Sequence, residues 1–328
     1  MARRCSAGRS NHDRSSVRPQ HTSPDGVRLS TELAPMQTVT PEVKGNWHQD
    51  WQSQEHAVAF DGRSGLDLRN LIREYEAFND VQLLTERLSR STRIGLLEIG
   101  CATGEFYRYL RTAYPHVRYA GVDISRPAVA RARAKYPHGI FVATDPSMPL
   151  AERLSEAGVH PCPEIVYAKD VVHHQTRPFE LLSELLGMAS EALIIRTRTR
   201  DVGPTELDPE RSCQYHYGGW MPYIVFNMQE LIERIREEAP ASEVVVRRHH
   251  VVLGGRYHRF LPKELYLKET GTAESAVGVF KTTDRAGRAT IADRRERAPR
   301  YTWDYRLKHA LRQAVDAWRP PQTRDAEI

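Results

Sequence analysis

Between residues 94 and 197 the chain alternates between short apolar runs and amphipathic stretches. The apolar runs have the length of buried strands and predict strands over residues 94–99, 117–123, 140–145, 164–170 and 192–197. The stretches between them place hydrophobic residues at helical spacing and predict helices over residues 106–114, 127–136, 150–157 and 178–189. Strands and helices that alternate in this way favour a mostly parallel sheet with helices on both faces.

The pattern continues on both sides of this region. Residues 64–88 predict one or two amphipathic helices, and residues 41–64 place Trp47, Trp51 and Phe60 among polar residues, where they dock on the core or on a substrate; we favour the core. After a helix over residues 228–238 capped by Asn227, residues 243–252 and 260–268 predict two strands joined by a turn at Gly254-Gly255. The predicted fold is therefore a doubly wound, mostly parallel α/β sheet.

Residues 198–225 interrupt this rhythm. They are first polar and then rich in aromatic residues, and Gly218-Gly219 would allow a hinge. A long segment without periodicity inside a compact domain is usually functional or disordered, and the aromatic residues argue against disorder. We predict a substrate lid; the alternative is a structural loop packed on its own aromatic residues.

The first strand ends in a glycine turn that is suited to binding a ligand. Glycines allow a sharp turn, and the following helix offers unpaired N–H groups. The sequence Glu98-Ile-Gly-Cys-Ala-Thr-Gly104 lacks the G-x-G-x-x-G spacing of a dinucleotide site. It resembles the first motif of class I S-adenosylmethionine-dependent methyltransferases, E/D-x-G-x-G-x-G, and departs from it at Ala102.

This resemblance spans about residues 65–270 and implies S-adenosylmethionine as cofactor. It also implies that the doubly wound α/β sheet has seven strands, is mostly parallel and ends in an antiparallel last hairpin. It implies that the turn wraps the methionine part and that Glu98 interacts with its polar end. Asp123, which ends the second strand 23 residues after Gly100, stands near the spacing expected of a ribose-binding acid, although it can also cap the next helix. An acid at Asp145 would accept from the adenine amino group; a solvated loop aspartate is the alternative. The predicted cofactor-binding residues are Glu98, Gly100, Cys101, Ala102, Gly104, Asp123, Ile124, Asp145, Lys169 and Asp170.

Candidate acceptor residues follow the fourth and fifth strands, because ligands bind at the carboxyl ends of strands in open α/β sheets. His173 or His174 is the candidate general base and His216 is a rival, unless these histidines are simply satisfied loop residues. Arg196, Arg198, Tyr215 and Trp220 are the candidate substrate-binding residues. Two arginines favour a carboxylate or phosphate on the acceptor, unless they pair with Asp170 or Asp201.

Composition narrows the remaining possibilities. The formal net charge of +5 is located in the ends of the chain, since residues 1–36 carry +3, residues 281–328 carry +5 and the middle carries −3. Nucleic-acid binders concentrate charge on a working face, so a nucleic-acid partner is not favoured. The four cysteines form no C-x-x-C pair and indicate neither a metal site nor a disulfide framework. No apolar run reaches the ~20 residues of a membrane span, and a cytoplasmic location fits.

The predicted organisation has four parts. Residues 1–36 form a disordered basic tail, residues 37–90 form a helical extension that roofs the cofactor site, residues 91–270 form the methyltransferase domain, and residues 271–328 form a basic extension. The predicted function is methyl transfer to a small-molecule acceptor, most simply a hydroxyl of a sugar or secondary metabolite. The alternatives are a binding protein that keeps the fold without transfer and an RNA methyltransferase that uses the basic tails.

Overall fold

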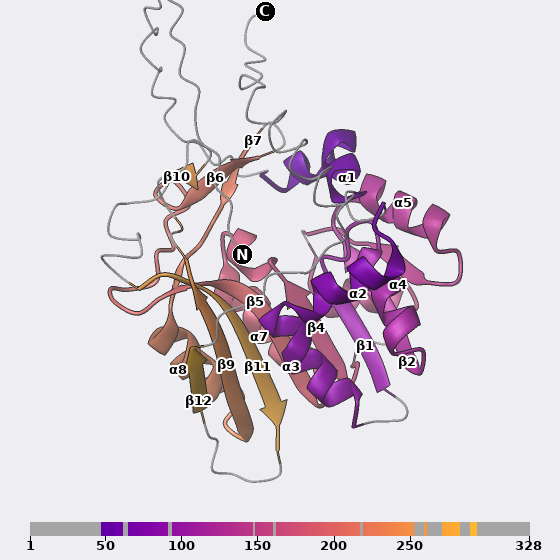
Figure 1. Ribbon diagram of the computed structural model, residues 1–328. Coiled ribbons are helices and arrows are strands. Elements are labelled where there is room, and N and C mark those ends of the chain that lie inside the picture. The colour runs from indigo at the N-terminus through magenta and orange to yellow at the C-terminus, as the bar shows by residue number, and fades with distance from the viewer. Residues whose placement is uncertain are drawn as a thin grey trace, which may run out of the picture. The chain divides into compact units, whose positions relative to one another are not determined.

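A nine-stranded sheet organises the part of the chain that the computed structural model describes (Figure 1). That part comprises residues 47–61, 65–90, 94–146, 148–159, 162–216, 219–251, 253, 259–260, 271–282 and 289–293. The predicted tail over residues 1–36 and most of the predicted C-terminal extension lie outside these residues. All of the described residues fall within one compact unit, Pro41–Ile328.

The five parallel strands predicted by the apolar runs are all present. They are β1 (Ile94–Ile99), β2 (Val117–Asp123), β3 (Ile140–Ala143), β4 (Ile165–Lys169) and β5 (Ala192–Arg200). They lie in the order β5-β4-β1-β2-β3, with Leu96 in register with Tyr119 on one side and with Ile165 on the other. The strand order reverses between β1 and β4, so the carboxyl ends of these strands form the crevice in which ligands bind in this class of fold.

Antiparallel strands complete the sheet, and here one predicted boundary is wrong. β9 (Ser242–His250) matches the predicted strand over residues 243–252, but its antiparallel partner is β11 (Ala273–Lys281), which lies between β9 and β5. The sheet therefore continues past residue 270, into the predicted extension. The apolar run of β11 is short and follows polar residues, so the basic composition of the extension concealed it.

Two further strands add to this sheet. β12 (Ala289–Asp293) pairs parallel with β9, and β8 (Phe226–Asn227) pairs with the end of β5. The predicted strand over residues 260–268 lies outside the described residues except for Phe260, which belongs to β10 (Arg259–Phe260). With β11 in the place of that strand, seven strands form the doubly wound, mostly parallel sheet that the sequence predicted.

Helices cover both faces of the sheet, as predicted, and each face has its own hydrophobic core. One core contains residues of α6 (Leu150–Glu156), α7 (Pro178–Met188) and α8 (Met228–Glu238). The other contains residues of α2 (Leu68–Glu76), α3 (Asn79–Leu88), α4 (Glu105–Ala113) and α5 (Arg126–Lys135). Side-chain caps begin three of these helices, since Asp67 accepts from the Asn70 N–H, Ser125 from the Ala128 N–H, and Asn227 from those of Gln229 and Glu230.

The predicted lid contains a hairpin. β6 (Cys213–His216) and β7 (Gly219–Pro222) are antiparallel and form a three-stranded sheet with β10. β7 contacts η1 (Trp47–Gln52), a 3-10 helix that precedes α1 (Gln54–Phe60). Two segments that are distant in the sequence thus meet near the carboxyl ends of the parallel strands (Figure 1). None of the helices in the described part of the chain has the length and apolar content needed to cross a bilayer.

Candidate cofactor and acceptor site

A cavity of about 470 Å³ lies at the carboxyl ends of β1, β2 and β4. This volume falls within the usual range of about 300–1,000 Å³ for small-molecule sites. Most residues predicted from the sequence to bind cofactor or acceptor line it. They are Glu98, Gly100, Cys101, Ala102, Asp123, Ile124, Lys169, Asp170, His173, His174 and Arg198.

The turn after β1 has the backbone shape that its glycines predicted. Gly100 and Gly104 have φ values of +82° and +81°, and Ala102 between them has a φ of +45°. A side chain at Gly100 would place its Cβ 2.5 Å from Cγ2 of Val171, so glycine is needed there for space as well as for conformation. An L-residue in this left-handed region costs roughly 1–2 kcal/mol. Ala102 therefore sits in a conformation that would suit glycine better.

Asp123 connects this turn to the end of β2. Its Oδ2 accepts a hydrogen bond from the Ala102 N–H at 2.8 Å, and its Oδ1 accepts one from the Ser125 N–H at 2.7 Å. Burial raises the pKa of the Asp123 carboxyl, and these backbone N–H groups oppose that rise. Because each carboxylate oxygen can accept a second bond, Asp123 can hold the turn and still bind hydroxyl groups in the cavity.

Glu98 is almost fully buried at the end of β1 and accepts a hydrogen bond from the Tyr119 hydroxyl. Burial raises its pKa to about 8, although the Tyr119 hydrogen bond and the positive charge of Lys169 lower it. The Lys169 ammonium itself lies 4.0 Å from the ring centroid of Phe78. A cation that enters the cavity beside Glu98 would favour the ionised carboxylate.

Aromatic side chains from η1 and α1 form one wall of the cavity. Trp51 and His56 pack edge to face with ring centroids 4.6 Å apart, and His56 packs on Phe60 at the same separation. Trp47 also lines the cavity. From the sequence we favoured docking of these residues on the core. In the structure Trp47, Trp51 and Phe60 also line the cavity.

This N-terminal segment is attached to the end of β2 and to α5. The Gln52 side-chain amide donates to the Ile124 carbonyl at 2.6 Å and accepts from the Arg126 N–H at 3.1 Å. Asp61 forms ion pairs with Lys135 at 2.6 Å and with Arg131 at 3.0 Å. The aromatic wall is thus held beside the strand that carries Asp123.

His173 and His174 continue the wall from the other side. They follow β4 in a short 3-10 helix, η3 (Val172–His174), and the His174 ring lies 5.6 Å from that of Trp51. The His174 Nδ1 is 2.8 Å from the Pro222 carbonyl oxygen. A carbonyl can only accept, so Nδ1 carries the hydrogen and, in the neutral ring, Nε2 carries the lone pair. This tautomer leaves a basic nitrogen on a residue that lines the cavity.

The sequence itself matches a family over part of its length. Residues 97–191, which contain the turn, Asp123 and the two histidines, match the family described as "Methyltransferase domain". This part of the chain therefore matches a methyltransferase domain, in agreement with the resemblance of the glycine turn. S-adenosylmethionine is the cofactor that the sequence resemblance implies for this domain.

Solved structures of methyltransferases resemble this one at low sequence identity. The magnesium protoporphyrin IX methyltransferase of Synechocystis PCC 6803 with bound SAM is 13% identical, with a TM-score of 0.44, over 74% of this chain and 99% of that chain. The plantazolicin methyltransferase BpumL in complex with SAH is 16% identical, with a TM-score of 0.43, over 72% and 94%. The N-terminal domain of EvdMO1 with SAH bound is 14% identical, with a TM-score of 0.43, over 61% and 79%. No curated protein matches the chain.

The residues present in the methyltransferase cavity fit its cofactor. The strained turn exposes backbone next to the cavity, and Asp123 retains acceptor capacity towards hydroxyl groups. One carboxylate oxygen of Glu98 accepts a hydrogen bond from the Tyr119 hydroxyl. The Glu98 carboxyl would stabilise a cationic amino group placed beside it. Within the described residues, no group of three or more histidine, cysteine or acidic side chains is placed to hold a metal ion.

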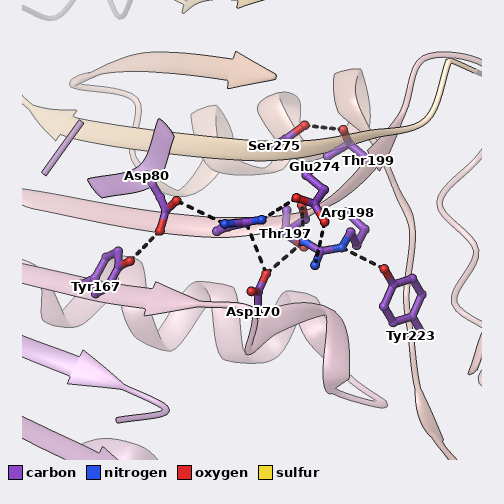
Figure 2. A network of polar contacts seen from close by, with 10 residues as sticks. Asp80, Tyr167, Asp170, Thr197, Arg198, Thr199, Tyr223, Glu274 and Ser275 are labelled. Atoms are coloured by element: carbon purple, nitrogen blue, oxygen red, sulfur yellow. Dashed lines mark hydrogen bonds and ion pairs between the residues drawn. The ribbon is translucent and has the colours of Figure 1, made fainter. Parts of the chain in front are cut away.

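The two predicted substrate arginines lie in a buried network of charges, which Figure 2 shows around Arg198 and Asp170. Arg198 donates to the Asp170 carboxylate at 2.9 Å and to the Tyr223 hydroxyl at 2.8 Å. Arg196 pairs with Glu274 and with Asp80. Burial disfavours an ionised Asp170, but the two arginines hold the pKa of its carboxyl well below the usual range.

Five predicted site residues do not border the methyltransferase cavity. Gly104 is the N-cap of α4, and Arg196 forms ion pairs with Glu274 and Asp80. Tyr215 and Trp220 pack on each other, with ring centroids 5.5 Å apart, and Tyr215 is exposed. These residues and Asp145 are absent from the lining. The side chain of His216 lies outside the described residues.

Sequence reasoning missed two residues of the acceptor wall. Tyr223 lines the cavity and packs on His173 at 5.3 Å, and His56 connects Trp51 with Phe60. Tyr223 belongs to the segment predicted as a lid, where its position after Pro222 gave no signal of its own. His56 lies in a polar stretch, and only its proximity to two other aromatic residues in the sequence could have indicated it.

Proposed function

We propose that the protein methylates a hydroxyl group on a neutral small molecule that contains a ring, such as a sugar or a secondary metabolite, and that His174 acts as the general base. The observation that carries this proposal is the His174 tautomer. Because the Pro222 carbonyl fixes the hydrogen on Nδ1, the lone pair is on Nε2 of a residue that lines the cavity. A positioned histidine contributes typically about 10²–10⁴-fold to a proton transfer.

The cofactor supplies a methyl group that is already activated on a sulfonium sulfur. The residues of this chain then have three tasks. They align the acceptor oxygen, they exclude water, and they accept the proton that the hydroxyl loses. Trp51 and the other rings of the wall serve the first two tasks, and His174 serves the third.

The charge balance of the site supports a neutral acceptor. Arg196 and Arg198 are together bound by three carboxylates, those of Asp80, Asp170 and Glu274. An anionic acceptor would have to compete with buried ion pairs that are already formed. These contacts favour the alternative in which the arginines pair with acids of the protein and do not select an acidic acceptor.

The aromatic wall supports an acceptor that contains a ring. Rings from η1, α1, η3 and Tyr223 follow one another around the cavity at centroid separations of 4.1–5.8 Å. Aromatic faces bind flat apolar surfaces, which planar rings and the C–H faces of sugars present.

The test is a paired substitution with a panel of acceptors. Release of S-adenosylhomocysteine is measured with neutral and acidic hydroxylated small molecules, and the best acceptor is then used with His174→Gln. We expect kcat to fall by about 10²–10⁴-fold, with cofactor affinity by calorimetry unchanged. His116→Gln is the control, since His116 contacts the Leu88 carbonyl away from the cavity. Turnover only of acidic acceptors, or full activity in His174→Gln, would reject the proposal.

A further inference from the structure

Arg198 bridges the two segments that carry the acceptor wall. It lies on β5, it is almost fully buried, and it borders the cavity. One side of its guanidinium contacts the residue that starts the histidine turn, and the other contacts the tyrosine that packs on the histidines. We propose that Arg198 is a positioning residue that orients His174 through Asp170 and Tyr223, an inference that rests on the proposed role of His174.

The first contact fixes the start of the histidine turn. Asp170 follows β4 with a φ of +57°, a conformation that a residue other than glycine adopts only when its surroundings hold it there. Its Oδ1 accepts from Nη1 of Arg198 at 2.9 Å, and its N–H donates to the Arg196 carbonyl at 3.0 Å. The chain therefore leaves β4 in a direction set by β5, and His173 and His174 are only three and four residues further on.

The second contact joins Arg198 to the segment Pro222-Tyr223, which contacts His174. Arg198 Nε donates to the Tyr223 hydroxyl, and the Tyr223 ring lies 5.8 Å from that of His174 and 5.3 Å from that of His173. The neighbouring residue, Pro222, provides the carbonyl that sets the tautomer of His174. The Ile224 N–H donates to the His173 carbonyl at 2.8 Å. One guanidinium thus contacts a side chain at both ends of the unit that contains His174.

Tyr223 allows this role to be tested without removing a buried charge. Its backbone is held independently, because its N–H donates to the Ser212 carbonyl and its carbonyl accepts from the Ser212 hydroxyl at 2.6 Å. Tyr223→Phe would remove the hydrogen bond to Arg198 and keep the ring and the backbone bonds. Any effect of this variant on His174 therefore arises from a change in the orientation of the Tyr223 side chain.

The experiment compares Tyr223→Phe and Arg198→Lys with the wild type. We expect Tyr223→Phe to lower kcat by about tenfold to a hundredfold with a smaller change in the acceptor KM, because a misplaced base acts mainly on the reaction step. The pH–rate profile should shift, and the NMR signals of the His174 imidazole should change and titrate at a different midpoint. Arg198→Lys keeps the charge beside Asp170 but cannot make two directed bonds, so it should change the chemical shift at least as much as Tyr223→Phe does.

The control is Tyr109→Phe, since Tyr109 is equally buried and lies outside the cavity. A lower melting temperature in Tyr223→Phe with unchanged pH profile and unchanged His174 signals would overturn the proposal and leave a purely structural ion pair. The NMR signals need no turnover. Loss of the positioning effect is therefore distinguishable from failure of the proposed function, which would instead appear as full activity in His174→Gln.

Discussion

The two halves of the cavity are built in different ways. In the cofactor half, the turn after β1, Glu98 and Asp123 come from adjacent strand ends within 26 residues of sequence, and backbone conformation does most of the shaping. In the acceptor half, side chains from residues 47–60, 170–175 and 214–223 are assembled across more than 150 residues. The cofactor half is a local structure, whereas the acceptor half exists only once distant segments have packed together.

This difference has a practical meaning for substitutions. A change in the cofactor half acts through the space and conformation available to the backbone, and neighbouring segments cannot compensate for it. A change in the acceptor half removes one ring among several, so the remaining rings preserve part of the surface. Substitutions in the two halves are therefore expected to differ in size and in the parameter that they affect.

The largest effect is expected from Gly100→Val. Its Cβ would lie 2.5 Å from Val171 at a φ of +82°, so the turn must change shape. We expect cofactor affinity by calorimetry to fall by more than about a hundredfold, with a lower melting temperature. Gly187→Val is the control, because a Cβ at Gly187 meets nothing within 4 Å. Near-normal binding in Gly100→Val would show that the turn does not form the cofactor site.

A smaller effect, in the other half, is expected from Trp51→Ala. Loss of one ring from the wall removes stacking worth about 0.5–1.5 kcal/mol beyond its buried area, so the acceptor KM should rise by about tenfold. Trp220→Ala is the matched control, because Trp220 packs on Tyr215 outside the cavity. Steady-state kinetics with the best acceptor measures both variants. An equal rise in Trp220→Ala would restore the sequence prediction that Tyr215 and Trp220 contact the substrate.

Glu98 allows the comparison to be sharpened with pH. Its pKa is raised to about 8, so the free protein binds a proton there near neutrality, and a cationic amino group in the cavity would displace that proton. Cofactor affinity should therefore rise with pH by up to about tenfold per unit below pH 8 and level off above it. Calorimetry in two buffers of different ionisation enthalpy measures the proton release. In Glu98→Gln the slope should disappear, and a slope that persists would assign it to another group.

The same raised pKa affects stability. A carboxyl with a folded pKa of about 8 and an unfolded pKa near 4.5 holds its proton more tightly in the folded state. The free energy of unfolding contributed by Glu98 is therefore fully present below about pH 4.5 and is lost as the pH rises towards 8. The melting temperature of Glu98→Gln, relative to the wild type, should accordingly be higher at pH 9 than at pH 5.

The smallest effect is expected from Ala102→Gly, which would restore the family motif. Glycine removes the strain at a φ of +45°, and we expect the free energy of unfolding to rise by about 1 kcal/mol. Chemical denaturation measures the change. A loss of stability would show that the Asp123 bond to the Ala102 N–H, together with the lower backbone entropy of alanine in the unfolded chain, outweighs the strain.

The contrast between the halves also explains what the sequence could predict. The five parallel strands and the residues of the turn follow from periodicity and glycine spacing, which are local properties. Tyr223 and the role of Arg198 could not be predicted, because a hydrogen bond between β5 and residue 223 depends on how the hairpin returns to the sheet. The strand β11 was missed for a related reason, since its apolar run is short and its place in the sheet depends on pairing with β5 and β9, which lie earlier in the chain.

The position of β11 has a consequence for how the chain folds as it is made. Domains fold as their N-terminal parts emerge during synthesis, yet this strand enters between two strands that precede it. Until residues 273–281 have been made, β5 and β9 cannot both be paired as in the finished sheet, and Arg196 and Arg198 lack the carboxylate of Glu274. In the nascent protein the sheet therefore stays open, and Asp80 and Asp170 pair with the two arginines without Glu274, until one late strand completes both.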